Sequence, residues 1–153
     1  MKKQQVLNKL ERAWAAFNES YTGLTDDQML QPGVIEKWSV RDILAHVSWW
    51  EEEALKHLPH ILLGVHPPRY SVVYGGIDAF NAQMTELKRE LSLAEVRAQL
   101  NETHHKLVEY LQSVPEEQFT TETRFRHRLR LDTYSHYPIH TRAIWEWREA
   151  VAV

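Results

Sequence analysis

The sequence predicts an all-α protein built as a four-helix bundle, with a longer loop between the second and third helices. Apolar residues recur three and four positions apart in four separate stretches, which is the period of an amphipathic helix. Helix-start signals precede these stretches, whereas the alternation typical of strands is rare. Four apolar stripes bury one another in a bundle. The length of 153 residues suits one domain over residues 1–153.

The first half of the chain is expected to contain two long helices. An apolar stripe predicts a helix from about Lys3 to Tyr21, and Thr25–Gln28 is typical of the start of a short helical turn. Ser39 begins the next helix with a capping box, since an aspartate follows three residues later. This helix should be interrupted at Pro59 and end at Gly64.

A long connection follows at Val65–Gly76, and its aromatic and β-branched residues suggest an extended segment at Tyr70–Tyr74. Asp78 can start the third helix. The capping box Ser92–Glu95 then restarts or bends this helix.

The last helix is expected to begin near Leu129–Asp132, after a polar loop at Thr120–Arg128. It carries His136 and His140, whose i, i+4 spacing places both imidazoles on one face. An isoleucine and a tryptophan share that face, so it should point inward. Pro138 lies between the histidines and would cost about 3 kcal/mol in a helix interior, so a kink or another partner for the freed carbonyl is expected.

A third histidine, His46, lies on the inward stripe of the second helix. Two facing helices can bring His46, His136 and His140 within bonding distance of one divalent metal ion. Three imidazoles leave coordination positions open for water or substrate, as in catalytic sites. Zn, Ni or Fe would suit such ligands. Histidines that only make hydrogen bonds in the core are the alternative.

Composition narrows the classes of function. A net charge of -3 and a pI of about 6.3 argue against a nucleic-acid partner. The absence of cysteine excludes disulfides and thiolate ligands, and it fits a cytoplasmic protein. No stretch reaches the roughly 20 apolar residues of a membrane span, and no signal peptide is expected at the first residues.

Further candidates surround the histidines. Glu53, seven residues after His46, is a candidate general base, although a solvated helix face is the simpler interpretation for it and for the two glutamates before it. Tyr134 is a candidate hydrogen-bond donor to the reacting group. Trp50, Asn81 and Tyr137 are candidates for a substrate pocket, with packing or a helix surface as the alternative.

Several motifs then resemble a known family. The segment Trp38–His46 (WSVRDILAH), followed by a Trp-Trp-Glu sequence, resembles the second-helix signature of the DinB-like superfamily. The segment Thr133–His140 (TYSHYPIH) looks like its fourth-helix HxxxH motif. Together with Asp78–Asn81, these segments are closest to the branch of the colibactin self-protection proteins, the ClbS/DfsB type.

The resemblance implies a four-helix bundle, often dimeric, with a metal held by one histidine from helix two and two from helix four. These positions are His46, His136 and His140 here. Known activities of the superfamily include thiol-dependent transfer and isomerisation, and in this branch the hydrolytic disarming of a reactive electrophile.

Three functions stay open from the sequence. The first is a metal-dependent hydrolase or thiol S-transferase acting on a small electrophilic molecule. The second is a bundle that binds or sequesters a small molecule in an aromatic cavity. The third is a bundle with structural histidines and no metal. A small-molecule ligand and a possible homodimer are expected, without nucleic acid or membrane as partners.

Overall fold

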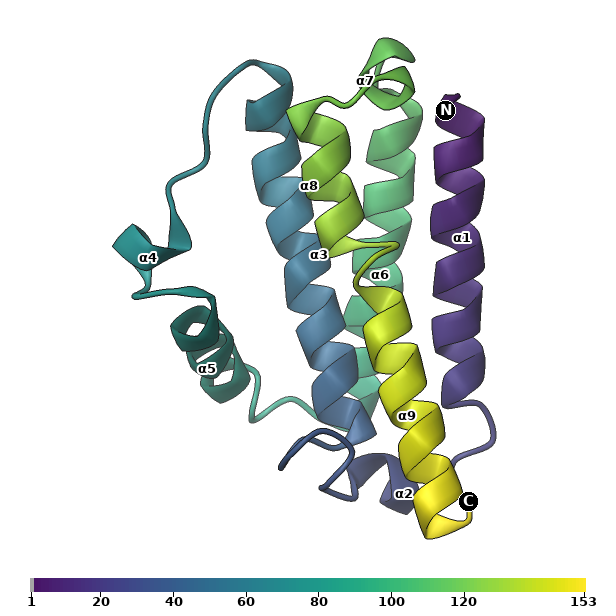
Figure 1. Cartoon of the computed structure of the whole chain (residues 1–153). Coiled ribbons are helices and arrows are strands. Elements are labelled where there is room, and N and C mark those ends of the chain that lie inside the picture. Colours follow the sequence, from purple (N-terminus) through teal and green to yellow (C-terminus); the bar gives the residue numbers. More distant parts are fainter. Residues whose placement is uncertain (1) are drawn as a thin grey trace.

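The computed structural model describes residues 2–153 and places its helices as the bundle expected from the sequence (Figure 1). The long helices are α1 (Lys3–Ser20), α3 (Val40–Leu62) and α6 (Leu93–Gln112), and the fourth position is shared by α8 (Arg124–Asp132) and α9 (Tyr137–Val151). Shorter helices are α2 (Asp26–Leu30), α4 (Tyr70–Val73), α5 (Ile77–Leu87) and α7 (Glu117–Thr120). Within residues 2–153, β pairing is limited to an isolated bridge between Ile35 and Trp38.

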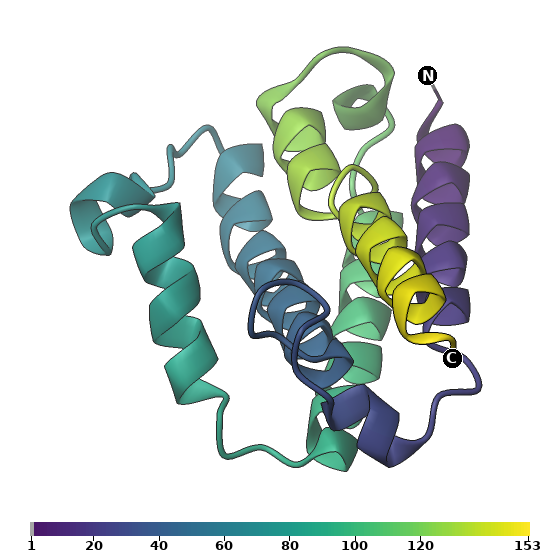
Figure 2. The same ribbon diagram turned by 60° about the horizontal axis from the view of Figure 1, so that its bottom comes forward.

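Helix α3 lies at the centre of the arrangement. It packs against α6 and α8, while α9 packs mainly against α1. Both views show α5 on the outer side of α3, joined to it by the long connection that carries α4 (Figure 2). Because α3 contacts helices on several sides, most of its residues from Val40 to Ala54 are buried. None of the helices within residues 2–153 combines the length and the hydropathy of a membrane span.

The predicted caps of α3 and α6 are confirmed. Ser39 accepts a hydrogen bond from the backbone of Asp42, whose carboxylate accepts one from the backbone of Ser39. Ser92 and Glu95 form the same reciprocal pair at the start of α6. The interruption at Pro59 is wrong, because α3 continues through it to Leu62.

The connection between α3 and α5 is long, as expected, but Tyr70–Val73 forms a helical turn and not an extended segment. The backbone N–H groups of Val73 and Tyr74 donate to the carbonyls of Arg69 and Tyr70, respectively. These local hydrogen bonds outweigh the β propensity of the two valines, which have no neighbouring strand to pair with. The valine side chains of α4 are exposed.

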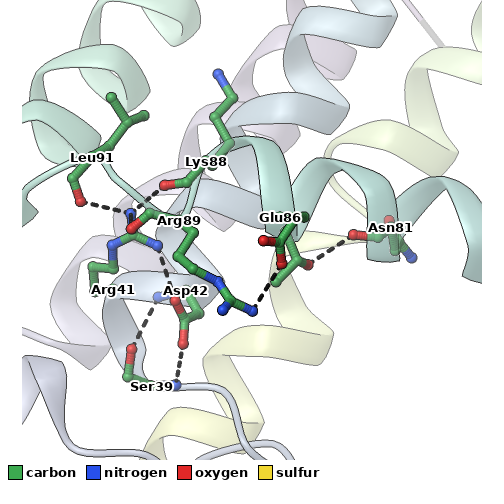
Figure 3. A network of polar contacts seen from close by, with 9 residues as sticks. Ser39, Arg41, Asp42, Asn81, Glu86, Lys88, Arg89 and Leu91 are labelled. Atoms are coloured by element: carbon green, nitrogen blue, oxygen red, sulfur yellow. Dashed lines mark hydrogen bonds and ion pairs between the residues drawn. The ribbon is translucent and has the colours of Figure 1, made fainter.

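Arg41 ties the start of α3 to the end of α5. Its guanidinium donates to the carbonyl oxygens of Lys88 and Leu91 and pairs with Asp42 at 3.0 Å (Figure 3). These carbonyls follow the last turn of α5. The Lys88 carbonyl also accepts from the backbone N–H of Leu91 at 3.2 Å, whereas among residues 2–153 the Leu91 carbonyl accepts only from Arg41. The side chain is buried, so Arg41 holds α5 against the face of α3 that carries His46.

Candidate metal centre and adjoining cavity

The two histidines of the HxxxH motif do not share one continuous helix. Helix α8 ends at Asp132, His136 is the N-cap of α9, and α9 begins at Tyr137. The expectation of a loop up to Arg128 and a continuous helix after it is therefore wrong, since α8 already begins at Arg124. Pro138 explains the break: its ring and missing N–H disfavour a helix interior, whereas the first turn needs no N–H there.

The three imidazoles predicted as ligands meet despite this break. Nε2 of His136 lies 3.0 Å from Nε2 of His46 and 2.9 Å from Nε2 of His140. The potential ligand atoms of the three residues all lie within 4.8 Å of one another, and no carboxylate of residues 2–153 joins this group. The interpretation of three separate core histidines, each with its own carboxylate or carbonyl partner, does not fit this geometry.

The donor set fits a divalent metal ion. A neutral imidazole nitrogen either donates or accepts one hydrogen bond along its axis, so Nε2 of His136 cannot satisfy both close neighbours. A cation that accepts one lone pair from each imidazole would remove this conflict, because no hydrogen bond between the rings is then needed. Tetrahedral zinc with Zn–N bonds of 2.0–2.1 Å would separate its nitrogen ligands by about 3.3 Å, close to the observed spacing.

Burial keeps the three rings neutral, which is the protonation state that binds metal. It lowers the pKa of His46 to about 2, with a further contribution from the other two histidines. It lowers the pKa of His136 to about 4. For His140, burial and the nearby His136 lower the pKa to about 3.

Aromatic packing braces the rings. Trp38 and Trp49 contact His46 with ring centroids 4.8 and 5.0 Å away. The Nδ1 atoms of all three histidines are buried without a hydrogen-bond partner among the described residues. The imidazoles are thus positioned by packing and not by the carboxylates that often orient metal-binding histidines.

A cavity of about 460 Å³ adjoins this cluster. Its walls combine two of the histidines with apolar and polar side chains from α3, α4, α5 and α8. They are His46, Trp50, Tyr70, Ile77, Asn81, Arg128, Leu131, Asp132 and His136. A mostly apolar cavity with a few polar groups beside a potential metal site has the character of a small-molecule site.

Asn81 has a defined orientation at this cavity. Its Oδ1 accepts hydrogen bonds from the indole N–H groups of Trp49 (3.2 Å) and Trp50 (3.0 Å). The side-chain amide N–H₂ makes no such bond among the described residues, so it is left as a donor. The structure thus places the pocket candidates Trp50 and Asn81 at the cavity, while their binding role stays a prediction.

The other candidates lie elsewhere. Tyr137 is buried, and its hydroxyl donates to Glu51 at 2.9 Å, away from the lining of the cavity. Tyr134 lies under the ammonium of Lys9 on α1 and does not line the cavity either. Glu53 accepts a hydrogen bond from Tyr70 at 2.9 Å.

The solvated face expected for the three consecutive glutamates is wrong for Glu51, which is 0% exposed, and for Glu53, which is also buried. Nδ1 of His104 lies 3.2 Å from Glu51, which also accepts the hydrogen bond from Tyr137. The central position of α3 accounts for this difference: it is covered on the side that a two-sided amphipathic pattern leaves to solvent.

The sequence did not identify five of the cavity residues, and three of these five are polar: Tyr70, Arg128 and Asp132. Arg128 donates from Nε to Asp132 (2.7 Å) and from its terminal nitrogen to the Tyr70 hydroxyl (2.8 Å). Asp132 precedes His136 by four residues, the same spacing that separates the two histidines, and this signal could have identified it.

A basic face lies beside the cavity. Residues 54–77 and 123–131 contain no Asp or Glu. These two segments contact each other, since His66 meets Arg124 and both segments line a cleft of about 520 Å³. We define the basic face by its exposed cations without a carboxylate partner among the described residues, which are Lys56, Arg69, Arg124 and Arg130.

Several solved structures share this fold, and three of them are described below. One is described as a sibling lethal factor precursor, DfsB (14% identity, 98% of this chain and 96% of that chain covered, TM-score 0.81). Another is the colibactin self-resistance protein ClbS in complex with a dsDNA (14% identity, 94% and 93% covered, TM-score 0.77). A third is an uncharacterised protein from Escherichia coli UTI89 (14% identity, 99% and 95% covered, TM-score 0.83). No curated protein matches the sequence.

The exclusion of nucleic acid as a partner is wrong. It rested on the net charge of -3, but ClbS, which has the same fold, was crystallised on double-stranded DNA. Net charge sums over the whole chain, whereas contacts to phosphates depend on the local field. In this chain two segments without Asp or Glu meet at His66 and Arg124, a local feature that the net charge does not describe.

The family is shown by a match along most of the chain. The model of the DinB superfamily matches residues 9–142 of the 153. This range includes the three clustered histidines and all helices that line the cavity. The two proteins that define the branch expected from the sequence are among the structures with the same fold. The chain belongs to the DinB superfamily.

Proposed function

We propose that the protein is a metal-dependent enzyme that acts on a small electrophilic molecule, by hydrolysis or by transfer to a thiol. The observation that carries this proposal is the convergence of His46, His136 and His140 beside a cavity that two of them line. A divalent metal held by these residues would polarise the electrophile or activate the nucleophile.

The cavity residues define how the substrate would bind. Trp50, Tyr70 and Ile77 offer an apolar wall that excludes water from a bound molecule. Because both indole N–H groups donate to the side-chain oxygen of Asn81, its amide N–H₂ is left available as a donor. It would orient a substrate that presents an oxygen acceptor, such as a carbonyl, next to the histidines.

Metal analysis tests this proposal. Protein purified without a nickel column is loaded with Zn²⁺, dialysed and analysed for metal, and its affinity is measured by competition with a chromogenic chelator. We expect one zinc ion per chain in the wild type and substoichiometric metal in His46→Ala and His140→Ala. His105→Ala is the control, because that side chain is 81% exposed on α6. Absence of stoichiometric metal in the wild type would refute the proposal.

A non-catalytic binding protein remains the rival function for the same cavity. Ring contacts between Trp50, Tyr70 and Phe80 make one side of the cavity aromatic. Saturable binding of an aromatic dye that survives loss of all three histidines, with no metal-dependent turnover, would favour this rival.

A second candidate function is binding of double-stranded DNA, supported by the basic face and by the DNA complex of ClbS. Arg126 and Arg128 have carboxylate partners, with Glu122 and Asp132, whereas the cations of the basic face have none among residues 2–153. Unpaired cations can replace the counterions of phosphates, which is the main source of sequence-independent affinity.

Fluorescence anisotropy with a short labelled duplex tests DNA binding. We expect binding at low salt that weakens linearly with log[salt], and a loss of about tenfold or more for the double variant Arg124→Glu, Arg130→Glu. Lys106→Glu is the control, because Lys106 already pairs with Glu102 on α6. Equal loss in both variants, or no binding at low salt, would exclude this function.

A further inference from the structure

Asp132 is the carboxylate of the cavity. The residues that line the cavity include no other Asp or Glu, and its histidines are the two metal-ligand candidates His46 and His136. Asp132 is itself outside the group of potential ligand atoms that lie within 4.8 Å of one another. It therefore shares the space with the candidate metal site without occupying a ligand position.

Hydrogen bonding leaves one oxygen of Asp132 available. Nε of Arg128, one turn earlier on α8, donates to Oδ2 at 2.7 Å. The other arm of the same guanidinium donates to the Tyr70 hydroxyl at 2.8 Å, which prevents Arg128 from turning away. Oδ1 has no hydrogen bond among the described residues. The carboxylate is thus held in place at one oxygen and free to exchange a proton at the other.

The surroundings of Asp132 suit proton transfer near neutral pH. Burial raises its pKa to about 6, although Arg128 opposes this effect, and Glu53 and Glu51 on α3 raise it further. The imidazoles facing the cavity are neutral, and Tyr70 stays protonated because burial raises its pKa. A carboxyl group of this kind is ionised at pH 7 and still basic enough to accept a proton.

We propose that Asp132 is the catalytic base of the cavity, accepting the proton of the attacking water or thiol at Oδ1. This inference rests on the proposed function. As the nucleophile's oxygen or sulfur bonds to the electrophilic carbon, its proton passes to Oδ1. The bond from that carbon to the leaving atom breaks, and the leaving atom takes the electron pair. Asp132 then returns the proton to the leaving group or to solvent.

The test compares Asp132→Asn with Glu122→Gln in zinc-loaded protein. Glu122 is a matched control, because it pairs with Arg126 of α8 as Asp132 pairs with Arg128, but the side chain of Glu122 is 82% exposed. The probe is 4-nitrophenyl acetate, hydrolysed to acetate and 4-nitrophenolate. We expect Asp132→Asn to lower kcat about 100-fold or more, with unchanged KM and bound zinc. We also expect kcat of the wild type to rise with an apparent pKa near 6, and this rise to disappear in the variant.

A wild-type rate and pH profile in Asp132→Asn would overturn the proposal while leaving the metal site intact.

If wild-type protein does not hydrolyse the ester or does not bind zinc, a metal-independent probe decides. 4-Nitrophenyl glycidyl ether is incubated with the metal-free protein. Oδ1 attacks the terminal epoxide carbon, the ring C–O bond opens, and the alkoxide takes a proton from water. Peptide mapping should find the ester on Asp132 in preference to Glu122, and an unlabelled Asp132 would overturn the proposal.

Discussion

Replacing Glu51 by alanine should destabilise the protein by about 3–5 kcal/mol, the cost of removing one partner from a buried ion pair. The carboxylate is 0% exposed and serves two partners, the hydroxyl of Tyr137 at 2.9 Å and Nδ1 of His104 at 3.2 Å. Without it, both partners stay buried, and each unsatisfied group costs about 1–3 kcal/mol. The hydrogen bond that His104 keeps joins its Nε2 to Glu11 at 3.0 Å.

Urea denaturation of the metal-free protein at pH 7 measures this effect. Glu52→Ala is the control, because the neighbouring carboxylate is 37% exposed and lies 3.4 Å from Lys88. We expect this control to lose less than about 1 kcal/mol. The double variant Glu51→Ala, His104→Ala should lose less than the sum of the two single variants, since the partners act together. A loss for Glu51→Ala no larger than that of the control would refute the reasoning.

Three further predictions concern the elements around the site. Pro138→Ala should cost less than about 1 kcal/mol in thermal denaturation, because proline in a first helical turn contributes mainly through the unfolded chain; a larger loss would mean that it holds the break open. Arg41→Met should lose about 2–4 kcal/mol in urea denaturation, because the partly buried carbonyls of Lys88 and Leu91 lose a charged donor; a value near zero would contradict its anchoring role. The pKa of Asp132 is raised to about 6 from about 3.9 in an unfolded chain, so the folded state binds this proton more tightly and wild-type stability falls as pH rises from 4 to 6. The stability of Asp132→Asn relative to wild type should therefore increase by about 2–3 kcal/mol between pH 4 and 7, and a pH-independent difference would contradict the raised pKa.

Local chemistry in the sequence determined most of the helices. The capping boxes at Ser39 and Ser92 act within one turn, and both appear as expected. Periodicity also predicted which apolar stripes of α1, α3 and α6 are buried, because each stripe depends only on the spacing of apolar residues along one helix. The same kind of local signal was misinterpreted at Tyr70–Val73, where turn hydrogen bonds outweighed the β propensity of the valines.

Pro138 shows the limit of periodic patterns. The i, i+4 spacing of His136 and His140 predicted neighbouring imidazoles, and their Nε2 atoms do lie 2.9 Å apart. The spacing did not predict that His136 precedes a new helix, because a proline in a first turn and a proline in a kinked interior look alike in sequence.

The sequence by itself was enough to predict the helical class, the family and the grouping of His46, His136 and His140, because residue type and spacing carry that information. Only the tertiary structure decided what surrounds them. Glu51 is buried because α3 is enclosed by its neighbours, and Asp132 faces the cavity because α8 packs on α3. The basic face likewise exists because two acid-free segments, far apart in the chain, fold side by side. Such contacts depend on how helices pack in space, which spacing within one helix does not specify.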